Sequence, residues 1–373
     1  MVTSLGLDAQ TCCAAARAGI VRATELDSFY VRDPEDGSIS GLVVHAAPMI
    51  TEGFEGDARL LRLTTAALVD LQKQTSHEPW KQGKTGFYFS VPELWQEFTG
   101  SALIADEEER KLKKQDEEEI KTLPEPPNEL RARDLLKTSA HIGKWPGKIE
   151  FRFTAASGNT GVTEALNKAI EELLSGVINV AIVGGVDSLL GENTLNWLTD
   201  TGRLKTLEMA TGLQPGEASA FIVLETLRGA NSRGGKAMAV VDRICIGAES
   251  RPLLSGNRSF GEGVATLIDQ AMAGNDRMAG QPPWVITDQN GESYRAVEWG
   301  NALVRLVKER PEMGDAVLTY PAMSFGDTGA ATGAVSACMV AKAFERGYAA
   351  TANAVILSSA LGAARSLLVL SCQ

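Results

Sequence analysis

The amino-acid sequence predicts an α/β fold, and three observations support this prediction. Strand-like and helix-like segments alternate along the 373 residues, which is the order typical of α/β proteins. The run VINVAIV at 177–183 is almost entirely apolar, as expected for a strand buried on both faces of a sheet. The second half of the chain repeats the order of elements found in the first half.

The first of the two repeated units lies before residue 190. Residues 59–71 carry apolar side chains at helical spacing, and residues 148–156 are typical of a strand that leads into a loop. Apolar positions from 162 to 174 then form one face of a helix, and Gly176 is a typical helix stop. The apolar strand at 177–183 follows this glycine.

The second unit has the same order in the last sixty residues of the chain. Residues 315–320 are typical of a strand, residues 330–346 of a helix that stops at Gly347, and residues 352–358 of another strand. Two units with one order indicate an internal duplication. We therefore expect two halves, 1–230 and 231–373.

One segment, about 98–133, stands apart as an insertion. Between 105 and 121 acidic and basic residues alternate four positions apart, as in Glu107/Lys111 and Glu117/Lys121, and each such pair stabilises a solvated helix by about 0.2–0.5 kcal/mol. The proline-rich residues 123–128 end this helix. We expect an exposed insertion, and a docking arm for a basic partner is the alternative.

The composition excludes several classes of protein. Hydrophobic residues make up 44% and charged residues 22% of the chain, which is ordinary for a globular protein. The net charge of −11 argues against a nucleic acid or an anionic membrane surface as partner. No apolar stretch is long enough to cross a bilayer, and the first residues lack the pattern of a signal peptide. We expect a cytoplasmic protein.

The cysteines indicate free thiols rather than disulfides or a metal site. They are odd in number, no CxxC occurs, and none is clustered with a histidine at zinc-site spacing. We therefore expect a reducing compartment, no metal and no cofactor. The five are Cys12, Cys13, Cys245, Cys338 and Cys372.

Five segments, taken in order, resemble the thiolase-fold β-ketoacyl synthases. The most specific is PGEASAFIVLE at 215–225, which is similar to the Gly-Glu/Asp-Gly-Ala strand of that family. The other four are VTSLG at 2–6 with the helix at 14–19, the helix stop and strand at 175–186, SFGDTGAATG at 324–333, and SSALGAARSLLVL at 358–370. The resemblance covers nearly the whole chain except about 98–133. It implies a five-layered α-β-α-β-α sandwich built from two duplicated halves.

The resemblance implies a nucleophilic cysteine on a tight turn at a helix N-terminus, but this chain has none there. Counting back seventeen residues from Gly176 places Asn159 at that turn, and an amide does not accept an acyl group. Asn is a good N-cap residue, so we interpret Asn159 as the cap of the following helix. Ser157 and Thr160 are nearby hydroxyls, and neither has an obvious base in the sequence.

The family also uses two histidines, which donate hydrogen bonds to the thioester carbonyl. The resemblance places Asn290 and Asp327 at these positions. A carboxylate there would repel a developing oxyanion. The family's lysine falls on Ala322, and its glycine-rich gating loop is reduced to ALGAA at 360–364. No register shift can supply a histidine after the turn, because every histidine precedes residue 142: His45, His77 and His141.

The leading hypothesis is a catalytically degenerate ketosynthase-like protein that acts as a binding, scaffold or accessory module. The resemblance implies a homodimer or a heterodimer. The partner is either an active synthase, as for chain-length factors, or a bacterial type VI secretion effector or adaptor, which the charged insertion and the combined losses favour. Cys245 and Cys338 are interpreted as core thiols.

The alternative hypothesis is an acyltransferase, a thioester hydrolase or a β-ketoacyl-carrier-protein synthase-type enzyme with non-standard residues. Ser157 would be the nucleophile, an acyl thioester the ligand, and Asn159, Asn290 and Asp327 would converge on one pocket. A further expectation concerns the first strand, which in the family precedes residues 2–6. Either this strand is missing from the sequence, or the first sheet is one strand short.

Overall fold

The computed structural model describes residues 1–32, 37, 39–75, 78–81, 83–92, 108, 111–112, 127–206, 209–274, 278 and 280–373. Most of the predicted insertion lies outside these residues, so the solvated helix at 105–121 stays a prediction. The last residues of the predicted insertion belong to a helix, α5 (Pro127–Ile142). Pro127, the last proline of the predicted proline-rich stretch, is the first residue of α5, a position that suits proline.

The first sheet contains four strands in the order β4-β3-β5-β6. They are β3 (Thr85–Ser90), β4 (Phe151–Ala155), β5 (Val180–Ser188) and β6 (Glu217–Glu225). β3 pairs in parallel with both β4 and β5, and β6 is antiparallel to β5. The predicted strand at 177–183 is β5, which begins three residues later than expected and is buried along nearly its whole length.

The second sheet contains five strands in the order β7-β11-β10-β8-β9. They are β7 (Val240–Ala248), β8 (Trp284–Thr287), β9 (Val317–Thr319), β10 (Asn353–Ser359) and β11 (Ala364–Ser371). β8 is parallel to β9 and β10, and β11 is antiparallel to β10 and β7. The strands expected at 315–320 and 352–358 are β9 and β10.

The two sheets repeat one topology, which confirms the predicted duplication. β4, β3, β5 and β6 correspond in order and direction to β9, β8, β10 and β11. The fifth place, which β7 fills beside β11, is held in the first sheet by Val2, whose N–H donates to Ser219 O at 2.7 Å. Among the described residues the first sheet is thus one strand shorter than the second.

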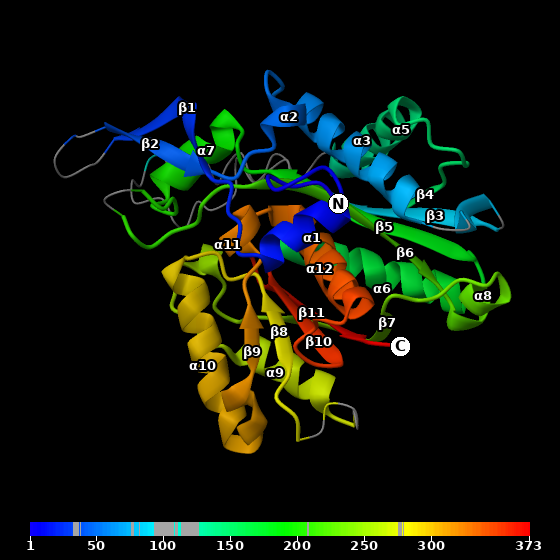
Figure 1. The fold of residues 1–373 in the computed structure, drawn as a ribbon. Coiled ribbons are helices and arrows are strands. Elements are labelled where there is room, and N and C mark those ends of the chain that lie inside the picture. Colours follow the sequence, from blue (N-terminus) through cyan, green and yellow to red (C-terminus); the bar gives the residue numbers. More distant parts are fainter. Residues whose placement is uncertain are drawn as a thin grey trace.

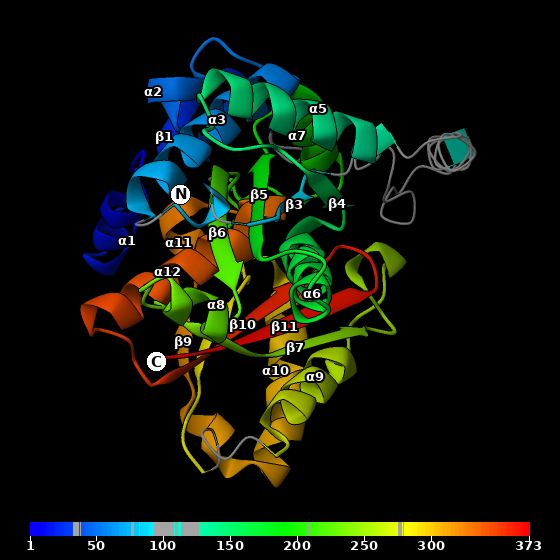
Figure 2. The same ribbon diagram turned by 90° about the vertical axis from the view of Figure 1, so that its right-hand side faces the viewer.

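Helices cover both sheets and separate them, so the molecule has five layers (Figures 1 and 2). α3 (Gly56–Gln74) and α5 cover the outer face of the first sheet. α6 (Gly161–Leu174) and α12 (Thr332–Arg346) lie between the sheets, with α1 (Ala9–Arg17) beside α12. α9 (Glu262–Met272) and α10 (Ser293–Glu309) cover the outer face of the second sheet. The predicted α-β-α-β-α sandwich is confirmed.

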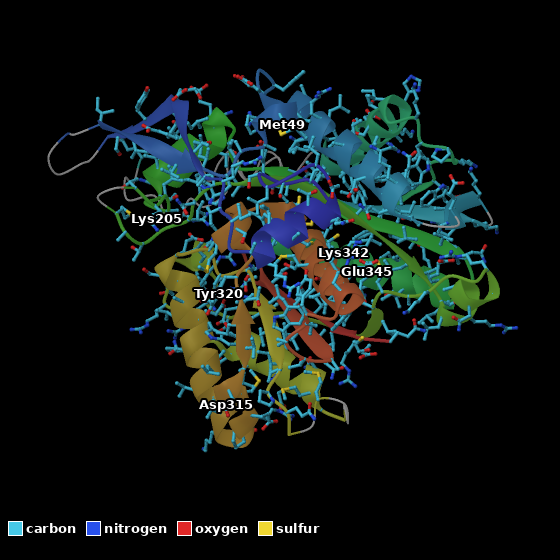
Figure 3. The ribbon with its side chains drawn as sticks, viewed as in Figure 1. Met49, Lys205, Asp315, Tyr320, Lys342 and Glu345 are labelled. Carbon is cyan, nitrogen blue, oxygen red and sulfur yellow. The ribbon has the colours of Figure 1, made fainter. Side chains whose placement is uncertain are left out.

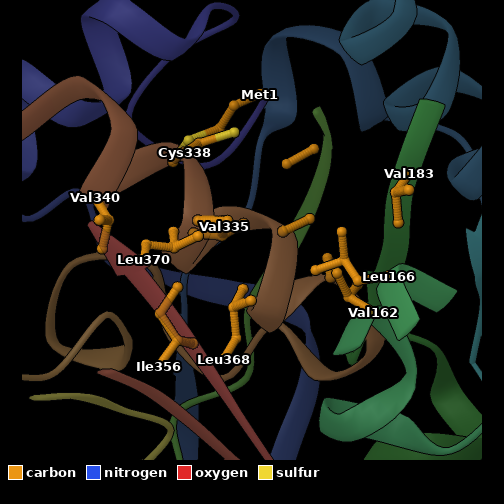
Figure 4. Close-up of a cluster of buried hydrophobic side chains, with 14 of the residues drawn as sticks. Met1, Val162, Leu166, Val183, Val335, Cys338, Val340, Ile356, Leu368 and Leu370 are labelled. Carbon is orange, nitrogen blue, oxygen red and sulfur yellow. The ribbon is translucent and has the colours of Figure 1, made fainter. Parts of the chain in front are cut away.

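The central layer is held by a core that both sheets share. Leu166 of α6, Val335 of α12 and Leu368 of β11 belong to it (Figure 4). The two helices cross closely, because a Cβ added at Gly333 would lie 2.9 Å from Cβ of Val162. Near its end α12 reaches the surface, where Lys342 and Glu345 form an ion pair of 2.9 Å (Figure 3). Close packing of α6 and α12 brings the beginnings of both helices together.

Smaller elements surround this sandwich. The strands β1 (Thr24–Arg32) and β2 (Ile39–Val44) form an antiparallel hairpin that shares a small core with α7 (Glu192–Asp200). Of the helices in the described residues, none is both long and apolar enough to cross a membrane. The remaining short helices are α2 (Pro48–Thr51), α8 (Leu227–Ser232), α11 (Ala322–Phe325), η1 (Pro79–Lys81), η4 (Gly158–Thr160), η5 (Leu253–Ser255), η6 (Pro311–Asp315) and η7 (Gly329–Ala331).

Candidate functional site

Both central helices begin with the same kind of turn. A short 3-10 helix precedes each of them, η4 before α6 and η7 before α12. Each turn opens with a glycine at positive φ, +53° at Gly158 and +45° at Gly329, a conformation that favours glycine. Asn159 lies in η4, so the residue predicted from spacing does sit at the turn that starts α6.

Asn159 does not cap α6, so its predicted structural role is wrong. The N-cap position is Thr160, which makes no side-chain capping bond. The Asn159 side chain is 6% exposed, and its Nδ2 donates to Oδ2 of Asp288 at 3.1 Å. The 3-10 turn before α6 moves the cap one residue onward, and a carboxylate from the loop after β8 pairs with the amide instead.

Asp288 connects Asn159, through hydrogen bonds and ion pairs, to two buried arginines. Its Oδ2 also accepts from Nη1 of Arg295 at 2.9 Å and from the N–H of Ser359 at 2.6 Å. Arg295 lies 3.5 Å from Glu292, which receives two hydrogen bonds from Arg203, at 2.6 and 3.0 Å. Such two-pronged pairs between arginine and carboxylate are strong and directional.

Asn290 joins the same set of buried groups to Asp327. Its Nδ2 donates to Oε2 of Glu292 at 2.8 Å and to Oδ2 of Asp327 at 2.6 Å. Asn159, Asn290 and Asp327 are therefore linked through bonded intermediates, and their predicted convergence on one pocket stays a prediction. We call this connected set the elbow network, and it consists of Asn159, Arg203, Asp288, Asn290, Glu292, Arg295 and Asp327.

Two carboxylates lie at the start of η7, which leads into α12. Oδ1 of Asp327 accepts from the N–H of Gly329 at 2.9 Å, and Oδ2 of Asp187 accepts from the N–H of Ala330 at 2.7 Å. Free N–H groups at a helix N-terminus stabilise negative charge. This explains why an acid is accommodated at position 327, where the family resemblance places a histidine.

Several buried carboxyl groups of this region have shifted pKa values. Complete burial raises the pKa of Asp187 to about 7, with Asp327 adding repulsion against two backbone hydrogen bonds. Burial also raises the pKa of Asp288. For Glu292 burial opposes ionisation, but the adjacent Arg203 outweighs it and the pKa falls to about 2. Glu292 therefore stays ionised, whereas Asp187 titrates near neutrality.

The elbow network is closely packed. A hollow bordered by Asp288, Gln289 and Arg295 has a volume of about 10 Å³, which is near the minimum for one water molecule. Nε2 of Gln289 and Nε of Arg295 are buried and make no hydrogen bond among the described residues. Among the described residues, no group of three or more His, Cys, Asp and Glu side chains is placed to hold a metal ion.

The turn at 360–364, which resembles the family's gating loop, is fastened by Arg365. Its guanidinium is fully buried, and Nη1 donates to the carbonyls of Ala360, Gly362 and Ala364 at 2.8–3.1 Å. Nε donates to Oε1 of Glu298 at 3.0 Å. The glycine content of the turn did not reveal this residue. The available signal was that Arg365 is the only charged residue of β11.

Ser157 and Thr160 share a carboxylate partner, so the expectation that neither has a base nearby is wrong. Oγ of Ser157 donates to Oε2 of Glu164 at 2.8 Å, and Oγ1 of Thr160 donates to Oε1 of Glu164 at 2.9 Å. Glu164 belongs to the first turn of α6, four residues after Thr160, a spacing that brings side chains together on a helix.

His45 lies beside the loop that carries Asp327, although it is distant in sequence. A Cβ added at Gly326 would be 3.0 Å from Cδ2 of His45, and the backbones of His45 and Asp327 both bond to the segment around Gly216. Burial lowers the pKa of His45, against hydrogen bonds with Gln214 and Ser324. The order of histidines along the chain excluded family-equivalent positions but could not exclude this proximity.

Two of the three cysteines after the elbow are buried, and the third, Cys372, is exposed. Cys245 and Cys338 lie in apolar clusters, and burial raises the pKa of both thiols. A raised pKa lowers the fraction of reactive thiolate. Their surroundings agree with the predicted role of core thiols.

Solved structures share this architecture. One is a chain from the structure of a type II PKS acyl-carrier protein in complex with its ketosynthase bound to the hexaketide. It matches this chain with a TM-score of 0.72 and 13% sequence identity, and the match covers 100% of this chain and 97% of that chain. The chain has the thiolase-like ketosynthase fold. The ishigamide ketosynthase/chain length factor (TM-score 0.64, 17% identity) and a β-ketoacyl synthase from Burkholderia phymatum (TM-score 0.68, 15% identity) share this fold, each with 100% and 97% coverage.

The ketosynthase fold is the full extent of this likeness. No protein-family model matches the chain, and no curated protein sequence matches it. At 13–17% identity the similarity is one of backbone arrangement, and a fold hosts many functions. Function must therefore be inferred from the residues at the elbow.

Proposed function

We propose that this protein is a non-condensing member of the ketosynthase fold that acts as a binding or scaffold partner. The observation that carries the proposal is the hydrogen bond from Asn159, at the elbow, to Asp288 within the closely packed elbow network. A condensing enzyme needs a nucleophile at this turn and room for an acyl chain. Asn159 offers neither, because its amide is not nucleophilic and its donor is already engaged.

The groups around Asn159 also oppose condensation chemistry. A condensing reaction develops negative charge on a thioester oxygen, which hydrogen-bond donors stabilise. The nearby Asp327 and Asp288 are carboxyl groups. Arg295, the positive partner of Asp288, also lies 3.5 Å from Glu292, and Asp327 accepts from the neutral Asn290 amide. The turn at 360–364, which would open to admit a substrate, is fastened by Arg365. These features favour a structural role for the elbow.

We infer that the partner binds at the outer edge of β4, where no other strand of the described residues pairs. β4 is the outermost strand of the first sheet and leads directly into the elbow, and dimers of the resembling family form through strands in this region. Edge strands expose unpaired backbone groups that template pairing with another chain. The partner would be a second copy, a related synthase, or a type VI secretion effector or adaptor.

Intact mass spectrometry tests the absence of condensation chemistry. Purified protein is incubated with acetyl-CoA, malonyl-CoA and a hexanoyl-loaded acyl-carrier protein, beside an active ketosynthase as positive control. We expect no added mass on the wild type. Asn159→Cys should also fail to condense, because the surrounding carboxylates remain. A stoichiometric acyl adduct on the wild type would contradict the proposal.

Light scattering during size-exclusion chromatography tests the assembly. A homodimer should show twice the chain mass of 39.7 kDa at micromolar concentration. A monomer that forms a stoichiometric complex when co-expressed with a synthase or with a secretion effector would identify a heterodimer and its class. A monomer that binds none of these would overturn the scaffold role.

Ser157 supports a second candidate function, acyl transfer or thioester hydrolysis. Its hydroxyl donates to Glu164 at 2.8 Å, the arrangement of a nucleophile and a base. In that reaction Ser157 Oγ attacks the thioester carbonyl carbon, Glu164 takes the hydroxyl proton, and the departing thiolate receives it, leaving an ester and a free thiol. An adduct lost in Ser157→Ala and in Glu164→Gln, but kept in Thr160→Val, would establish this function.

A further inference from the structure

β7 is an edge strand whose outer side is open. Among the described residues it pairs with β11 and with no other strand, and Figure 2 shows it at the rim of the second sheet with α9 beneath. The N–H of Glu249 donates to the carbonyl of Ala363 on the β11 side at 2.8 Å. Since backbone direction alternates along a strand, Ile244, Ile246 and Ala248 direct their N–H and C=O groups outward.

A groove runs between this edge and α9. Its volume is about 160 Å³, and its lining includes Ile246, Gly247, Glu262, Thr266, Leu267 and Gln270; we call it the β7 groove. Glycine at 247 keeps it open, because a Cβ there would stand 3.1 Å from Leu267. Glu262, Thr266 and Gln270 recur every four residues, so α9 presents one polar stripe as the wall facing the edge strand.

Along residues 244–248 the edge lacks several of the features by which proteins block strand addition, and the register shift of β7 against β11 lies toward its other end, at Asp242. Proline and lysine, two common protections, are absent from β7. The only arginine, Arg243, donates to the carbonyls of Gln270 and Ala273 at the end of α9, so its charge is held against the helix. Ile246 is 48% exposed on this edge. The strand is therefore both unpaired and partly apolar.

One acidic side chain lines the groove, and another lies farther along its edge strand. Glu262 lies at the end near Ala248, and Asp242 lies exposed toward the other end of β7. Glu262 pairs with Arg305 at 3.2 Å, and both side chains are about half exposed, so that pair holds it weakly. Asp242 and Ala248 are six residues apart in β7, about 20 Å at the rise of an extended strand, which is close to the span of a seven-residue peptide.

We propose that the β7 groove binds an extended peptide segment of a partner protein, which adds a strand to β7. Strand addition takes affinity from main-chain hydrogen bonds and specificity from alternate side chains. One set of side chains would enter the hollow beside Gly247, and the other would lie beside Ile246. Basic residues at both ends would face Asp242 and Glu262. The proposal does not depend on the chemistry of the elbow network.

Fluorescence anisotropy with a labelled peptide of sequence Lys-Val-Thr-Val-Thr-Val-Lys tests the proposal. We expect saturable binding to the wild type and slower hydrogen exchange at Ile244 and Ile246. Ile246→Pro removes one outward donor and is compatible with an edge strand, and Thr266→Lys fills the groove with positive charge. Each should weaken binding by about tenfold or more, equivalent to the loss of about 1.4 kcal/mol.

The controls distinguish specific binding in the groove from effects of misfolding and from nonspecific peptide binding. Val304→Lys, on the exposed face of α10, should bind like the wild type, and all variants should unfold near the wild-type temperature. Peptides with proline at both threonines, or with glutamate at both ends, should bind at least about tenfold more weakly. No binding up to 1 mM, or equal binding by both groove variants, would overturn the proposal. Self-association of the wild type that Ile246→Pro abolishes would assign the groove to a second copy and overturn it as well.

Discussion

Asp187, at the end of β5, accepts a 2.7 Å hydrogen bond from the backbone N–H of Ala330, at the start of the second central helix. The acid belongs to the first sheet and the amide to the second half of the chain. A Cβ at the preceding residue, Gly329, would lie 2.1 Å from Oδ2 of Asp187. This carboxyl group therefore requires both the helix N-terminus and the glycine beside it.

The titration of Asp187 should make the protein less stable as pH rises toward neutrality. Its folded pKa of about 7 exceeds the ordinary aspartate value, so the folded state binds the proton more tightly than the unfolded state. Its contribution is fully present below about pH 4 and is lost as pH rises through 7, at up to about 1.4 kcal/mol per unit. Denaturant unfolding of Asp187→Asn between pH 5 and 8 should show this slope removed.

The matched control for this measurement is Asp315→Asn. Asp315 is exposed at the far end of the second half (Figure 3), so its replacement should leave the slope unchanged. Equal slopes in the wild type and in Asp187→Asn would mean that Asp187 is ionised throughout this range.

His45 should contribute pH dependence of the opposite sign. Burial lowers its folded pKa below the ordinary histidine value, so the unfolded state binds the proton more tightly. The stability that neutral His45 provides is present above about pH 6.5 and is lost as pH falls through the folded pKa. His45→Gln should flatten the acid side of the stability profile. His141→Gln, on the exposed end of α5, is the control, and an unchanged acid limb in His45→Gln would refute the assignment.

Removing one partner of the Arg203–Glu292 pair should cost more than removing both. Both side chains are buried, so Arg203→Met leaves Glu292 with only Arg295, at 3.5 Å, as a positive partner and should lower the free energy of unfolding by about 3–5 kcal/mol. The double variant Arg203→Met/Glu292→Leu should recover much of this loss. Urea unfolding of the single and double variants measures the coupling, and additive losses would show that the pair does not interact.

Arg365 should hold the 360–364 turn closed, and two substitutions separate its two kinds of contact. Arg365→Lys keeps a positive charge beside Glu298 but cannot bond three carbonyls together, so exchange of the amides in the turn should quicken. Arg365→Met should quicken it further and destabilise the fold by about 3–5 kcal/mol through the unpaired Glu298. Hydrogen exchange measured by mass spectrometry reports the turn, with β3 as internal reference. Unchanged exchange in both variants would show that packing alone closes the turn.

The fold was predictable because apolar periodicity and glycine stops are local signals. The helix at 162–174 and the strand at 352–358 appear within a residue or two of their predicted bounds as α6 and β10. Spacing from Gly176 also placed Asn159 at the elbow. Its interaction was not predictable from spacing, because Asp288 is 129 residues away in the chain and only the packing of the two sheets brings them together.

The remaining members of the site were missed for related reasons. Arg203 and Glu292 are ordinary charged residues in loops or at a helix end, and nothing in the sequence marks them as buried partners. Asp187 follows an apolar strand, which is a weak signal for a buried acid. The contact of Glu164 was predictable from the sequence, since its spacing of four residues from Thr160 places both side chains on one helix face.

The contacts that close the elbow also join the two halves of the chain. Asn159 bonds to Asp288, Arg203 to Glu292, and Asp187 to Ala330, each pair with one member on either side of residue 230. If one half unfolded alone, buried charged groups of the other half would lose their partners. This cost makes partial unfolding unfavourable. The duplicated sandwich should therefore melt in one cooperative transition, with calorimetric and van't Hoff enthalpies equal.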